Sequence, residues 1–142
     1  MKYEVSKIEA AVDQLDWAIK LFLDEKAYVP AITLAGASEE IIGGTLGDKS
    51  VFGHVKKTLE SKYNLPSAII SQQHLNRAKN WLKHWTDMKD DETTEIELET
   101  EAIQYITRAI ANLVHYDQSI SSETPRFFEW LNTNKTQLLN GL

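Results

Sequence analysis

The chain has 142 residues, enough for one compact domain with a sizeable hydrophobic core. It contains no cysteine, which excludes disulfides, thiolate zinc sites and a cysteine nucleophile. The net charge is −6, but the acidic excess lies between residues 87 and 101, where eight acidic side chains accompany one lysine. The remaining surface is close to neutral and can meet a phosphate, yet it has no basic stripe, so we expect no binding of extended duplex DNA.

The charges near the start of the chain and the lengths of its apolar stretches predict where the protein is located. Charges at Lys2, Glu4 and Lys7 interrupt the first residues, so we expect no signal peptide. The longest apolar-rich stretches, such as Ala31 to Ala37, are far too short to cross a bilayer. We therefore expect a cytoplasmic protein with no membrane contact.

Apolar residues recur at helical spacing along nearly all 142 residues, which predicts an all-α fold: one single-domain bundle of five or six helices. The first helix should begin after Ser6, whose hydroxyl caps it while Glu9 reaches back in a capping box. The second should run over residues 30–42 and end at Gly43-Gly44, because glycine accepts the left-handed backbone of a helix end.

Four more helices follow in the predicted order. They are expected at Ser50–Tyr63, from about Ser71 to Met88, from the acidic segment through Leu113, and from a capping Thr124 and first-turn Pro125 through Leu131. Leu65-Pro66 should break the first of these four. The alternating run over residues 94–99 has no partner strand, so we interpret it as a loop entering a helix.

Two apparent sites fail on inspection. The segment over residues 43–50 is glycine-rich, but Asp48 stands where a phosphate loop requires glycine, and the segment follows a helix rather than a strand. Glu39 and Glu40 lie about 100° apart on a helix and no Glu-x-x-His motif accompanies them, so a di-metal site is not expected. One of these acids should be solvated and the other salt-bridged at the rim. We expect no metal and no cofactor.

One constellation supports a function. Arg77, Asn80 and His84 share one stripe of the predicted fourth helix, at about 100° per residue. The stripe borders the apolar face, so its side chains should be partly desolvated yet reachable. An imidazole can move a proton to or from a ribose hydroxyl, and a guanidinium can stabilise charge on a phosphate, with no metal required. Asparagine would orient either group.

The spacing of Arg77, Asn80 and His84 in a helical bundle resembles that of the HEPN superfamily (higher eukaryotes and prokaryotes nucleotide-binding domains). The resemblance implies a metal-independent ribonuclease or nucleotide-binding module that works as a homodimer, with RNA or a nucleotide as its ligand. HEPN proteins often place a polar residue directly after the arginine, where this chain has Ala78. The chain is also similar, over residues 31–41 and 75–84, to a family of small uncharacterised bacterial proteins.

The arginine–histidine spacing recurs in the fifth predicted helix at Arg108 and His115, with Asn112 between them. These side chains point away from the apolar stripe of that helix, so we expect them on a solvated face without a site.

Two alternatives to a ribonuclease remain open. The first is a non-catalytic domain that binds a nucleotide or small phosphorylated ligand at the same stripe. The second is an interaction protein in which the stripe is structural, with Arg77 paired to an acid such as Glu39. Trp81, Trp85 and the aromatic residues of the last helix would then suit a homodimer or partner interface, together with the small-residue segment from Ala31 to Ala37.

Overall fold

The computed structural model describes residues 1–64, 75–84 and 93–136. In these ranges it has six α-helices, one short 3-10 turn and no strand, which confirms the all-α helical bundle. The elements are α1 (Lys7–Glu25), α2 (Tyr28–Leu46), η1 (Gly47–Lys49), α3 (Val51–Tyr63), α5 (Arg77–Lys83), α6 (Leu98–Asp117) and α7 (Thr124–Asn134).

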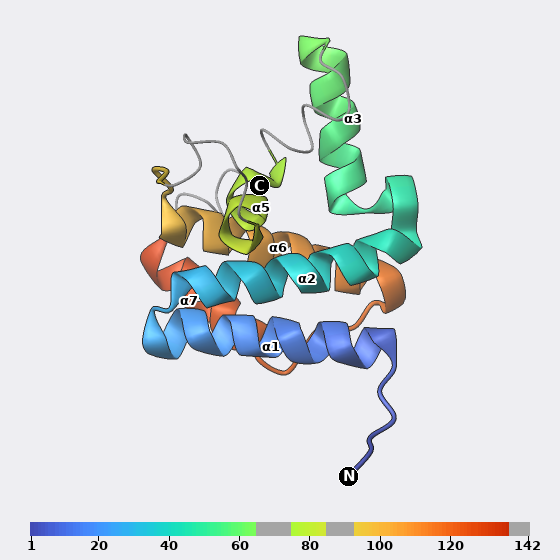
Figure 1. The fold of residues 1–142 in the computed structure, drawn as a ribbon, viewed down its shortest axis with the longest axis vertical. Coiled ribbons are helices and arrows are strands. Elements are labelled where there is room, and N and C mark those ends of the chain that lie inside the picture. Colours follow the sequence, from blue (N-terminus) through green and yellow to red (C-terminus); the bar gives the residue numbers. More distant parts are fainter. Residues whose placement is uncertain (65–74, 85–92, 137–142) are drawn as a thin grey trace.

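Helix α2 is the centre of the bundle. It packs against α1 on one side and α6 on the other, and α5 lies against it further along (Figure 1). Helix α3 projects from this bundle (Figure 1). The core consists of apolar side chains from α1, α2, α6 and α7, among them Leu15, Ile19, Ile32, Ile42, Tyr105, Ile106, Leu113 and Phe127, each at most 1% exposed.

Local capping begins both α1, where it was predicted, and α3, where only the start of the helix was predicted. The Ser6 hydroxyl accepts from the Glu9 N–H at 3.1 Å, and the Glu9 carboxylate accepts from the Ser6 N–H at 2.8 Å. The Ser50 hydroxyl likewise accepts from the Gly53 N–H at 2.9 Å and begins α3. At α7 the prediction is off by one residue, since Thr124 is the first helical residue and not the cap.

The predicted end of α2 at Gly43-Gly44 is wrong. The helix continues through both glycines to Leu46 and ends at Gly47, whose φ of 57° lies in the left-handed region. Gly43 lies against the amide of Asn112 on α6, so packing between α2 and α6 keeps this turn helical despite its weak intrinsic propensity.

The predicted fourth helix is confirmed only over Arg77–Lys83. His84 has extended backbone, with φ −126° and ψ 139°, and therefore ends the helix. The rest of that prediction beyond residues 75–84, and the break at Leu65-Pro66, lie outside the described residues.

A glycine lets α5 approach α2. A Cβ on Gly36 would lie 2.3 Å from Cδ of Lys79, whose side chain is fully buried. The Lys79 ammonium is paired, because it donates to the Glu40 carboxylate at 2.6 Å. The stem of Lys79 thus packs as an apolar residue, while its charge is neutralised at the surface.

We expect Gly36→Ala to destabilise the fold by about 1–3 kcal/mol, because the added methyl group overlaps the immobilised Lys79 stem. Gly44→Ala in the same helix is the matched control. Nothing lies within 4 Å of its Cβ position, so the higher helix propensity of alanine should raise the free energy of unfolding by up to about 1 kcal/mol. Urea denaturation measures both, and equal effects of the two substitutions would contradict the packing described here.

Candidate functional site

The Arg77–Asn80–His84 stripe is reachable, but only Asn80 is partly buried. Arg77 and His84 are exposed. Arg77 donates to the Thr94 hydroxyl at 2.5 Å, and the His84 N–H donates to the Asn80 carbonyl at 3.1 Å. None of the three side chains lines either cavity described below. Their catalytic role stays a prediction.

The second copy of the spacing is built into the fold. The Arg108 guanidinium donates to Oε2 of Glu39 at 3.0 Å, with 11% and 3% of the two side chains exposed. Arg108 also donates to the Leu75 carbonyl at 3.3 Å and lies 4.5 Å from the centre of the Tyr105 ring. The prediction that Arg108 lies on a solvated face is therefore wrong, and Glu39 pairs with Arg108 rather than Arg77.

Asn112, one turn further along α6, is fully buried. Its Oδ1 accepts from the Val51 N–H at 2.9 Å, and its Nδ2 donates to the Glu39 carbonyl at 3.3 Å. One side chain thus joins α2 to the start of α3. The predicted solvation of Asn112 is also wrong, whereas His115, the third residue of this copy, is exposed as expected.

The physical reason for both corrections is that α6 is buried on two faces. The apolar stripe identified from the sequence packs in the core, as predicted, and the adjacent face is covered by Leu75 at the start of α5 and by the first turn of α3. Such coverage is tertiary, so the helical periodicity of α6 alone does not reveal it.

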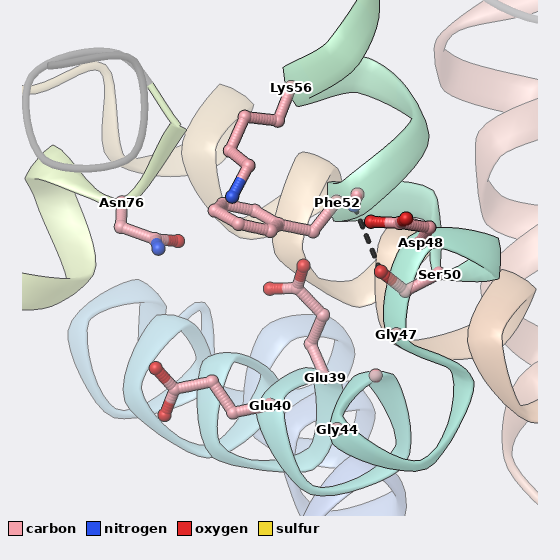
Figure 2. A pocket seen from close by; sticks show the side chains of 11 residues that line it. Glu39, Glu40, Gly44, Gly47, Asp48, Ser50, Phe52, Lys56 and Asn76 are labelled. Carbon is pink, nitrogen blue, oxygen red and sulfur yellow. Dashed lines mark hydrogen bonds between the residues drawn. The ribbon is translucent and has the colours of Figure 1, made fainter. Parts of the chain in front are cut away.

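A cavity of about 440 Å³ opens in front of Glu39, and we call it the Glu39 cavity (Figure 2). Its walls include Glu39, Phe52, Lys56 and Asn76, and the turn around Ser50 closes one side. Figure 2 shows the Glu39 carboxylate rising from α2 into this space, with Phe52 and Lys56 above it on α3 and Asn76 opposite. The glycine-rich segment over residues 43–50 also lines this cavity.

A second cavity, about 650 Å³ and open to solvent, lies on the other side of the η1 turn. We call it the histidine groove. It is lined by Asp48, Lys49, Ser50, Val51, His54 and His115. Asp48 and Ser50 line both cavities, so one wall separates them. In the described part of the chain, no cluster of three or more histidine or acidic side chains is arranged to hold a metal ion.

The sequence analysis missed His54 and Lys49 as candidate residues. Neither stands in a motif, and His54 belongs to a helix distant in sequence from His115. The recurrence of the arginine–histidine spacing in α6 was the one available signal, and it pointed to His115.

The electrostatics of the Glu39 cavity are dominated by burial. Burial raises the pKa of the Glu39 carboxyl above its ordinary value, while the charges of Arg108 and Lys79 oppose this shift. Glu40 and Asp48 are neutralised by Lys79 at 2.6 Å and by Lys57 at 2.9 Å.

Comparisons with known proteins found no relative: no family model, no curated protein and no solved structure matches the chain. Across the described ranges, no helix combines the length and apolar character needed to span a membrane.

The raised pKa of Glu39 predicts a pH-dependent stability difference. A carboxyl whose pKa is higher in the folded than in the unfolded state binds its proton more tightly when folded. Its stabilising contribution is complete below the ordinary pKa of glutamate and is lost as the pH rises through the raised value. We therefore expect the free energy of unfolding of the wild type to fall relative to that of Glu39→Gln as the pH rises above the ordinary pKa of glutamate.

Urea titrations of the two proteins at a series of pH values measure this difference, and contributions from titrating groups distant from Glu39 cancel in the comparison. A difference that stays constant, or that grows in favour of the wild type with rising pH, would contradict the raised pKa.

Proposed function

We propose that the chain is a HEPN-like helical domain that binds single-stranded RNA and cleaves it without a metal ion, with His54 and His115 as the proton-transfer pair. The observation that carries this proposal is the histidine groove, where two imidazoles and the Lys49 ammonium line one solvent-open cavity. Paired imidazoles beside a cation are the groups that proton transfer around a phosphodiester needs.

The reaction needs only these side chains. One imidazole removes the proton from a ribose 2′-hydroxyl, and the oxygen attacks the adjacent phosphorus. The bond from phosphorus to the 5′-oxygen breaks, and the other imidazole, protonated, gives its proton to that oxygen. The products are a 2′,3′-cyclic phosphate and a free 5′-hydroxyl. The Lys49 ammonium stabilises the charge that builds up on the phosphate oxygens.

The groove is held by the interior of the protein. Lys49 belongs to η1, His54 to the first turn of α3 and His115 to the last turn of α6. Asn112 holds the Val51 N–H, so it fixes the start of α3 against α6 between the two histidines. In this proposal Arg108 and Asn112 position the groove, and His115 is the member of the second copy that meets RNA.

The Arg77–Asn80–His84 stripe is the second candidate for the active site within the same proposed function. Its favouring observation is that Arg77, at the start of α5, and His84, directly after its end, are both exposed, where RNA can reach them. Arg77 is held by Thr94, but no partner fixes the His84 imidazole in the described residues. The histidine groove supplies two imidazoles, and for this reason we favour it.

The proposal predicts that the purified protein cleaves single-stranded RNA in the presence of a chelator and leaves a 2′,3′-cyclic phosphate. His54→Ala and His115→Ala should each slow cleavage by about 10²–10⁴-fold, the usual contribution of general acid–base catalysis. Both side chains are exposed, so both variants should keep the wild-type circular-dichroism spectrum and melting temperature.

His84→Ala separates the two candidate sites. Loss of cleavage in His84→Ala, with activity retained in His54→Ala and His115→Ala, would move the site to the Arg77 stripe. If the wild-type protein binds RNA but never cleaves it, the non-catalytic binding module replaces the ribonuclease as the proposed function.

Part of the surface predicted for the homodimer is buried inside the monomer. Ala31, Ala35 and Gly36 of the small-residue segment are buried inside the monomer, against the neighbouring helices. Of the aromatic residues predicted for the interface in the last helix, Phe127 is buried and Phe128 is 40% exposed. Trp17 on α1, which was not among the predicted residues, is 51% exposed.

We expect light scattering at tens of micromolar to give the mass of a dimer, and Phe128→Asp to shift it toward the monomer because it places a charge in an apolar contact. Gly44→Ala, away from both aromatics, serves as the control. A monomer mass for the wild type would remove the dimer.

A further inference from the structure

The Glu39 carboxylate has one oxygen without a partner. Its Oε2 accepts from Arg108, but its Oε1 is buried and has no hydrogen bond among the described residues. A buried acceptor without a donor is costly, and the Glu39 side chain lines a cavity, with its carboxylate directed toward that space (Figure 2). The geometry therefore calls for a ligand that donates a hydrogen bond at this point.

The other acids of the Glu39 cavity are already neutralised, since Glu40 pairs with Lys79 and Asp48 with Lys57. Lys56 is different: within the described residues it forms no ion pair, and its ammonium lies 5.6 Å from the centre of the Phe52 ring. The cavity thus offers a cation that can meet an anionic group.

Two further features of the Glu39 cavity describe the body of the ligand. The half-buried Phe52 ring provides a face on which a flat ring can stack. Asn76 lies opposite with an Oδ1 that is buried and unpaired in the described part of the chain, and its amide offers both a donor and an acceptor. A volume of about 440 Å³ is in the range of pockets that hold small molecules.

We infer that the Glu39 cavity binds the guanine base of a nucleotide, and this inference rests on the proposed action of the protein on RNA. Guanine presents two adjacent donors, N1–H and the 2-amino group, to a carboxylate. Oε1 is free to accept one, and Oε2 keeps a lone pair beside its bond to Arg108. The base stacks on Phe52, and the phosphate meets Lys56.

The other bases fit this carboxylate less well. Adenine and cytosine place an acceptor nitrogen beside their amino group, and uracil flanks its single N–H with two carbonyls. Each of these acceptors would face the Glu39 oxygens and repel them. Because Asp48 and Ser50 line both cavities, a base in front of Glu39 lies one wall away from the histidine groove. The protein would then cleave RNA next to guanosine.

The test is equilibrium binding of mononucleotides to the full chain by calorimetry. Guanosine 3′-monophosphate should bind at least about tenfold more tightly than inosine 3′-monophosphate, which lacks only the 2-amino group, since a matched base contact is worth about 1–3 kcal/mol. Uridine 3′-monophosphate should bind more weakly still. Equal affinities for the three nucleotides, or no binding of any, would overturn the inference.

Variants locate the site. Lys56→Ala should weaken guanosine 3′-monophosphate several-fold and leave guanosine itself unchanged, because the lysine meets only the phosphate. Phe52→Leu should weaken both by removing the stacking face. Lys20→Ala, at a partly buried lysine on α1 that lies over the Trp17 ring, is the matched control and should change neither.

Glu39→Gln should abolish the preference for guanosine over inosine while leaving binding of the phosphate. If this variant does not fold, Phe52→Leu and Lys56→Ala still decide the question, because neither residue is in the buried ion pair. Unchanged guanosine 3′-monophosphate affinity in both would overturn the inference. Since mononucleotides cannot be cleaved, tight guanosine binding without RNA cleavage would refute only the ribonuclease proposal.

Discussion

The ion pair between Glu39 and Arg108 is the constraint on which the site depends. Two charges buried at a helix interface cost several kcal/mol of desolvation, and the pair persists only because further groups satisfy it. The Leu75 carbonyl and the Tyr105 ring do so from the arginine side. The pair thereby fixes α2, α6 and the start of α5 together. The compensation is incomplete on both sides, since Nε of Arg108 and Oε1 of Glu39 are buried without a partner among the described residues, and the cavity opens at the glutamate.

What the sequence could predict was set by local interactions. The capping box at Ser6 and the cap at Ser50 involve residues three apart, so reading the chain in order was enough to place the starts of α1 and α3. The end of α2 was missed because Gly43 packs against Asn112, a residue far along the chain. A propensity argument contains no information about that contact.

The candidate site divides in the same way. Periodicity identified the core stripe of α6. The partners of Arg108 and Asn112, however, come from α2, α3 and the segment just before α5. These partners determine whether the polar face of α6 is solvated or buried. Lys79 shows the converse. A lysine on a helix is ordinarily solvated, but the Lys79 side chain is buried, because Gly36 has no side chain to occupy the same space. His54 and Lys49 needed the fold before they could be associated with His115.

The clamp made by Asn112 also bears on how such a chain can change over time. Its two partners are the Val51 N–H and the Glu39 carbonyl, both main-chain groups. Substitution at position 51 therefore leaves the clamp intact for every residue except proline, which has no N–H to donate. Position 112 has no such latitude, because aspartate lacks the donor, leucine lacks both groups and glutamine is one methylene too long for a fully buried space. Among descendants of this protein, we expect position 51 to vary and position 112 to remain asparagine, although the two positions form one contact.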